Sequence, residues 1–229
     1  MLAHLGRLFS GITVLAYARD PAALYLSALQ QRVQGGHCLR DLDTPRSYRY
    51  TLRRQLEPYI DWMGCENVIL RHFQRANLEE GDVVADFLAQ LSRFGKKISI
   101  PGHNVNESLP GAAIAWLLMV NETWDRSALT DMRKQAITRL KRSPAVAQLP
   151  AFSPKMPEAK ALIRARAAKD CAWINRTFLD GQELLPLQTG PAPAYPGDAA
   201  WRAELRDALL AYLTPEALAI IAAEMVGTQ

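Results

Sequence analysis

The sequence is poor in cysteine, in long apolar runs and in the features of exported proteins. Its three cysteines, Cys38, Cys65 and Cys171, are widely spaced and form no metal-ligand pattern, so we expect free thiols rather than disulfides or a zinc site. The longest apolar run, residues 111–120, has about half the length of a bilayer-spanning helix. Residues 1–10 lack the apolar stretch and cleavage site of a signal peptide. These absences predict a cytoplasmic protein without a membrane span.

Clustered positive charge is also missing. The chain has 27 Lys and Arg against 23 Asp and Glu, a net charge of +4, but no block of roughly five consecutive basic residues. Nucleic acid is therefore not an expected partner, whereas a small anionic ligand is compatible with the charge. Hydrophobic residues make up 49% of the chain, which excludes a disordered protein and allows a packed core.

What the chain does contain is a strand–helix alternation in its first part. Two short hydrophobic segments, 12–18 and 67–73, are predicted to be β-strands. Helical patterns at 22–34, ending at a glycine pair, and at 48–63 separate them. Strands joined by long helical connections are typically parallel and covered on both faces, so we expect an α/β core.

Helical periodicity dominates the remainder. The segment 83–94 predicts an amphipathic helix with Val84, Phe87, Leu88 and Leu91 facing the core. Further helices are expected at 110–121, 126–142, 157–179, 199–212 and 215–226, with a proline-rich linker at 186–198. The predicted organisation is a partial α/β nucleotide-binding core over 1–125 followed by a mostly helical cap over 126–229.

Two parallel strands do not make a stable sheet by themselves, because parallel sheets need more strands and cover on both faces. Residues 2–9 also have the pattern of the last turns of an amphipathic helix. We therefore expect that residues of the same domain precede Met1, and that the chain is truncated or degenerate with an incomplete sheet. An open sheet edge also favours homo-oligomers.

One motif joins fold and chemistry. The 12–18 segment runs directly into Arg19-Asp20-Pro21, and Ser27 follows eight residues after Arg19. Asp20 suits a helix N-cap and Pro21 the first helical position, so a guanidinium is expected at a strand's carboxyl end and a hydroxyl on the next helix. Ligands of open α/β sheets bind at such strand ends, and arginine suits a phosphate there. A surface ion pair is the alternative for Arg19 alone.

The Arg19-Asp20-Pro21…Ser27 motif resembles the PAPS-dependent sulfotransferases, in particular a bacterial sulfotransferase-like group (PAPS is 3′-phosphoadenosine 5′-phosphosulfate). Residues 64–69, 81–88 and 106–109 are similar to further segments of that family. The resemblance implies a P-loop-type sulfotransferase-like fold in which Arg19 and Ser27 hold the 3′-phosphate of PAPS or of its product, adenosine 3′,5′-bisphosphate (PAP). It also implies no metal, and transfer of a sulfuryl group to a hydroxyl acceptor, with a glycan as one candidate.

The chain departs from that family at its start. Residues 6–11 contain neither the lysine nor the preceding strand of the family's phosphosulfate loop, and His4 is the one histidine before Arg19 that could replace the family's base. The catalytic residues are therefore unassigned. The alternative interpretation is a non-enzymatic helical interaction module on a sulfotransferase-like scaffold, in which the helices over 199–226 bind a partner.

Overall fold

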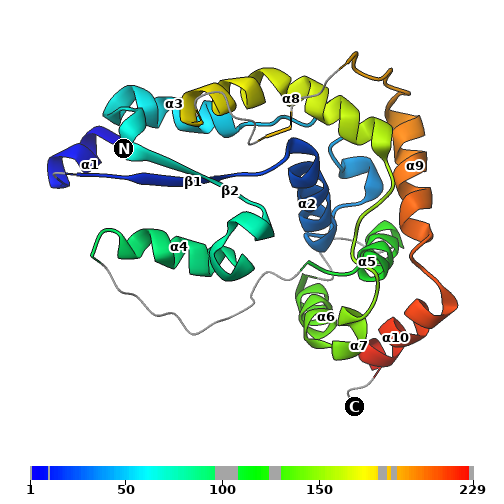
Figure 1. Ribbon diagram of the computed structural model, residues 1–229. Coiled ribbons are helices and arrows are strands. Elements are labelled where there is room, and N and C mark those ends of the chain that lie inside the picture. Colours follow the sequence, from blue (N-terminus) through cyan, green and yellow to red (C-terminus); the bar gives the residue numbers. More distant parts are fainter. Residues whose placement is uncertain are drawn as a thin grey trace. The chain divides into compact units, whose positions relative to one another are not determined.

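The computed structural model describes residues 2–9, 11–95, 108–123, 130–179, 185–186 and 190–226. Over these residues the chain is a mixed α/β protein, mostly helical, with a small two-stranded parallel sheet (Figure 1). It forms two compact units. The first comprises Met1–Pro21, Arg49–His103 and Arg164–Pro191, and the second comprises Ala22–Tyr48, Asn104–Ile163 and Ala192–Gln229. The division into 1–125 and 126–229 stays a prediction.

The sheet lies in the first unit. Strands β1 (Val14–Ala18) and β2 (Val68–His72) pair in parallel, from Val14 opposite Val68 to Ala18 opposite His72. The predicted parallel pair is therefore confirmed. One more backbone hydrogen bond, from the Phe73 N–H to the Ala18 carbonyl at 2.7 Å, extends the contact past the strand ends.

Three helices of the first unit are α1 (Leu2–Leu8), α3 (Leu52–Met63) and α4 (Val83–Ser92). The unit also contains the C-terminal part of α8 (Pro157–Phe178) and the 3₁₀ turns η2 (Cys65–Asn67), η3 (Arg75–Asn77) and η4 (Glu79–Gly81). Helix α3 begins at Leu52, so its predicted start at residue 48 is wrong. The chain before it is not helical because Tyr50 is buried in the core and its hydroxyl bonds to a strand-end carbonyl.

The core of the first unit forms between β1 and α8. Its buried members are Ala18, Tyr50, Ala167, Cys171, Ile174 and Leu185. Asn175 on α8 fixes the backbone of Leu185 through two hydrogen bonds of 3.1 Å, one donated by its side-chain amide and one accepted by its side-chain oxygen. The side chain of one buried asparagine thus holds a loop residue in this core.

Helix α4 faces the sheet with a different side from the predicted one. Val84 and Phe87 are 40% and 41% exposed, so their predicted inward orientation is wrong, whereas Asp86 is fully buried. The cause is a polar contact with the sheet. Arg71 on β2 donates from Nε to Asp86 Oδ2 at 3.1 Å, and the Tyr17 hydroxyl on β1 donates to the same oxygen at 2.9 Å. Burying this carboxylate against its donors turns the two apolar side chains outward.

Within the described residues, the regular elements of the second unit are helices, and one isolated antiparallel bridge joins Pro110 to Ala151. Its elements are α2 (Pro21–Gln34, from Ala22 onward), η1 (Leu39–Asp41), α5 (Gly111–Thr123), α6 (Thr130–Arg142), α7 (Pro144–Ala147), the first part of α8, α9 (Asp198–Leu210) and α10 (Pro215–Val226). The helices predicted from periodicity in this unit are confirmed with shifts at their ends, except that residues 126–129 of the predicted helix 126–142 lie outside the described residues. The short α7 was not predicted, although Ser143 caps it in the usual way by accepting from Val146 N–H at 3.1 Å.

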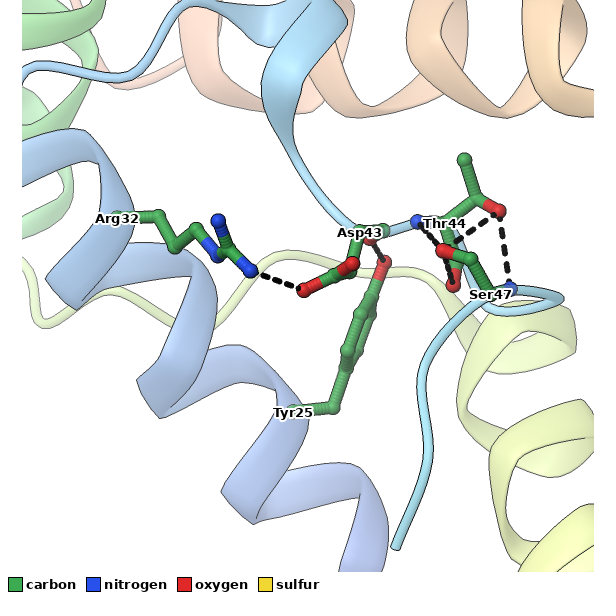
Figure 2. Close-up of polar contacts among 5 residues, drawn as sticks. All are labelled: Tyr25, Arg32, Asp43, Thr44 and Ser47. Atoms are coloured by element: carbon green, nitrogen blue, oxygen red, sulfur yellow. Dashed lines mark hydrogen bonds and ion pairs between the residues drawn. The ribbon is translucent and has the colours of Figure 1, made fainter.

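The loop after α2 is fixed onto that helix by polar contacts (Figure 2). The Tyr25 hydroxyl donates to the Asp43 carbonyl at 2.8 Å, and Arg32 Nη2 pairs with Asp43 Oδ2 at 2.9 Å. Beside them, the Thr44 N–H donates to Ser47 Oγ at 2.9 Å, which closes a tight turn. The loop is therefore ordered by side chains of α2 and by its own hydroxyl groups.

Tryptophans contribute to both cores. Trp201 is 1% exposed in the core of the second unit, and Trp116 packs against that core. Trp173 packs against the core of the first unit, and Trp124 lies outside the described residues. Within the described ranges no single helix is long and apolar enough to cross a membrane; α9 and α10 pass that test only as a pair bent by 78°.

Candidate functional site

Arg19 lies at the carboxyl edge of the sheet. It directly follows β1, and Phe73 directly follows β2 in the parallel register. The guanidinium carbon of Arg19 lies 5.3 Å from the centroid of the Phe73 ring, within the range of a cation–π contact. Tyr17 packs edge-on against the same ring, with centroids 6.3 Å apart. An aromatic platform thus positions the Arg19 side chain where ligands of parallel sheets bind.

The backbone around Arg19 is held on both sides. The Arg19 carbonyl accepts a hydrogen bond from the Tyr50 hydroxyl at 3.2 Å. The next residue, Asp20, accepts two hydrogen bonds from Arg164 on α8, from Nε at 2.8 Å and from Nη2 at 3.1 Å. The turn from β1 into α2 is therefore constrained by two elements distant in sequence.

The Arg164–Asp20 pair also sets the local electrostatics. The hydrogen bonds from Arg164 to Asp20 raise the pKa of the guanidinium against the opposing effect of its desolvation. The two parallel N–H···O contacts place the positive charge of Arg164 against the negative charge of the Asp20 carboxylate and balance it. Compensation matters because an unpaired carboxylate beside Arg19 would repel an anion approaching that arginine.

Ser27 lies on α2 and is half-buried. Arg19 belongs to the first unit and Ser27 to the second. Their convergence on one phosphate group stays a prediction.

His72 is a further polar side chain at the end of β2. Its Nδ1 lies 2.9 Å from the side-chain nitrogen of Asn77 in η3. Because an amide nitrogen only donates, the neutral ring accepts at Nδ1 and carries its proton at Nε2. Burial lowers the pKa of His72 more than the charge of Asp20 raises it, which favours the neutral ring at pH 7. In this form Nε2 can donate a hydrogen bond.

Four other side chains that could carry chemistry lie in different surroundings, namely His4, Cys38, Asp82 and Asp86. His4 is exposed on α1. The Cys38 thiol donates to the Asn121 carbonyl at 3.0 Å, as a structural thiol does. Asp82 caps α4 by accepting from two backbone N–H groups, and Asp86 is bound by Arg71. Across the described residues, no group of three or more His, Cys, Asp or Glu side chains is arranged to hold a metal ion.

No family model, curated protein or solved structure matches this chain.

Proposed function

We propose that this chain is a sulfotransferase-like protein whose Arg19 and Ser27 bind the 3′-phosphate of PAPS or PAP. The observation that carries the proposal is the position of Arg19. It follows β1 at the carboxyl edge of the parallel sheet, lies over the Phe73 ring, and has its backbone held by Tyr50. These contacts support an anion site because they order a guanidinium at a strand end.

The chemistry of the two side chains fits a 3′-phosphate. A guanidinium offers two parallel N–H groups to a pair of phosphate oxygens, which lysine does not. The Ser27 hydroxyl supplies a further donor. No corresponding residues are assigned to the 5′-phosphosulfate, because residues 6–11 lack the lysine of the family's phosphosulfate loop. In this proposal Arg19 and Ser27 recognise the 3′-phosphate, which is the group that distinguishes PAPS and PAP from other adenosine nucleotides.

The proposed reaction moves a sulfuryl group from PAPS to a hydroxyl acceptor, with a glycan as one candidate. The acceptor oxygen forms the new bond to sulfur, the bond from sulfur to the 5′-phosphate oxygen breaks, PAP leaves, and the acceptor proton passes to a base. Arg19 and Ser27 would position the nucleotide at a distance from the sulfur. Since the sequence assigns no base, we propose the nucleotide-binding step for Arg19 and Ser27 and leave the catalytic residues of the transfer unassigned.

Calorimetric titration with PAP tests the proposal. We expect Arg19→Ala to weaken PAP binding roughly 10- to 100-fold, because hydrogen bonds to a charged group contribute about 1.5–3 kcal/mol. Adenosine 5′-monophosphate, which lacks the 3′-phosphate, should bind the wild type more weakly than PAP does, and the variant should no longer distinguish the two nucleotides. Arg93→Ala, at an exposed arginine after α4, is the matched control. Unchanged PAP affinity in a folded Arg19→Ala protein would overturn the proposal.

The rival function is the helical interaction module. Leu210, Leu218 and Val226 on α9 and α10 are 46%, 40% and 78% exposed, which favours a partner-binding role for these helices. This function requires no nucleotide. A wild-type protein that shows neither heat of binding nor thermal stabilisation with PAP would support the module over the sulfotransferase-like protein.

A further inference from the structure

Arg133 occupies a core-facing position of α6 in the second unit. The side of this helix that faces the core comprises Arg133, Ile137 and Leu140, at the i, i+4 and i+7 spacing of an amphipathic helix. Ile137 and Leu140 pack in the apolar core, and Arg133 is 8% exposed. A charged side chain is therefore buried at a position where the pattern favours an apolar one, and such a charge is costly unless a partner balances it.

The turn that ends α2 makes room for this guanidinium. Gly36 has a φ of +88°, in the left-handed region that favours glycine. A Cβ at this position would lie 2.6 Å from Cζ and from Nη1 of Arg133, which is too close for any side chain. The second glycine of the pair after α2 thus does more than end the helix, because it allows the Arg133 guanidinium to pack against the backbone of the turn.

Two nitrogens of the guanidinium lack a partner. Within the part of the chain that the structure describes, Nε and Nη2 of Arg133 are buried and have no hydrogen-bond partner. Two carboxylates of neighbouring elements are engaged elsewhere. Asp131 pairs with Lys134 at 3.7 Å, and Glu122 at the end of α5 accepts from the Leu39 N–H at 2.6 Å. Neither of these carboxylates binds Nε or Nη2, so the positive charge still calls for an anion.

Two other arginines of this chain show which anion suits these nitrogens. Arg71 donates from Nε and Nη2 to the two carboxylate oxygens of Asp86. Arg164 holds Asp20 through the same pair of nitrogens. We propose that Arg133 binds the carboxylate of a small organic acid in the same way, one oxygen on Nε and the other on Nη2. The acid has to be small, because both nitrogens are buried.

Thermal unfolding of the full chain in formate, against chloride at equal ionic strength, tests the proposal. Formate is the smallest carboxylate. The wild-type Tm should rise by about 2–4 °C when formate exceeds its dissociation constant several-fold, because the ligand binds only the folded state. Arg133→Met replaces the charge with a long apolar side chain, so the variant should fold and lose the formate effect. The matched control Arg142→Met, at an exposed position of the same helix, should keep it.

Arginine side-chain NMR on the isotope-labelled wild type keeps the test decisive if the Arg133 variant does not fold. The Arg133 Nε–H signal should shift with formate and saturate, whereas that of Arg142 should not. A wild-type Tm that is equal in formate and chloride would overturn the proposal. So would an Arg133→Met protein that responds like the wild type, or an Arg133 signal that formate leaves unchanged.

The carboxylate site does not depend on the proposed nucleotide function. Arg133 and Gly36 belong to the second unit, whereas Arg19 belongs to the first. Arg19→Ala should therefore keep the full formate effect while it loses affinity for PAP. Failure of PAP binding would leave the carboxylate site standing, and the reverse also holds.

Discussion

Arg164 donates hydrogen bonds to both carboxylate oxygens of Asp20, although 144 positions separate the two residues in the sequence. Asp20 is the immediate neighbour of Arg19, so a helix from late in the chain fixes the turn that carries the proposed phosphate ligand. The pair lies within the first unit, and its two side chains are 36% and 19% exposed. It is thus a partly buried contact that links α8 to the end of β1.

Replacing Arg164 tests this link. Arg164→Ala should weaken PAP binding by roughly tenfold, because the turn that presents Arg19 loses its outer support and Asp20 loses its compensating charge. Affinity for adenosine 5′-monophosphate should change little, since that nucleotide lacks the 3′-phosphate. Arg166→Ala, at an exposed position of the same helix, serves as the control in the same calorimetric titration. Equal losses for both nucleotides would indicate general misfolding instead.

Asp86 should make the stability of the protein dependent on pH. The hydrogen bonds from Arg71 hold the pKa of this carboxyl below its ordinary value, with Tyr17 adding to the effect and burial opposing it. A lowered pKa in the folded state means that the stabilisation is present above the unfolded value, near pH 4, and is lost as the pH falls through the folded value. Asp86→Asn should lower the free energy of unfolding by about 3 kcal/mol at neutral pH, and by less in acid.

Denaturant titrations at several pH values measure that difference. The difference in the free energy of unfolding between the wild type and Asp86→Asn should be largest at neutral pH and should decrease below about pH 4. Asp61→Asn, at an exposed position of α3 in the same unit, should change stability by less than about 0.5 kcal/mol throughout. A constant gap across the pH range would show that the Asp86 carboxylate is not the titrating group.

The three cysteines should differ in reactivity. Burial raises the pKa of the Cys171 thiol to about 12, with smaller contributions from Asp170 and Asp20, whereas Cys38 and Cys65 are only half-buried. The thiolate is the nucleophile, so iodoacetamide at mildly alkaline pH should modify Cys38 and Cys65 and leave Cys171 intact in the native protein. Peptide mass spectrometry measures the result. Native Cys171 that reacts as fast as Cys65 would contradict the buried placement.

Local patterns predicted most of the elements. The hydrophobic runs at 12–18 and 67–73 predicted the two strands. The long helical connection between them predicted parallel pairing, which the register confirms. Helical periodicity likewise located α2, α8, α9 and α10 to within a few residues at each end. These features depend on neighbours in sequence, which is why sequence reasoning reaches them.

Contacts between distant residues account for the misses. The orientation of α4 follows from Asp86 bonding to Tyr17, 69 positions earlier, and this outweighs the apolar pattern of Val84 and Phe87. No local pattern contains that pairing. At the candidate site, the strand-end position of Arg19 was predictable, but its supports Tyr50 and Arg164 come from separate parts of the chain and carried no sequence signal.

The Phe73 ring beneath Arg19 has a thermodynamic consequence. An arginine side chain loses rotational entropy when it is immobilised by a ligand, and that loss weakens binding. Stacking on the ring, at 5.3 Å, restricts the guanidinium when the chain folds, before any anion arrives. Association should then involve little further ordering of this side chain, so replacing Phe73 with leucine would show up as a more unfavourable binding entropy.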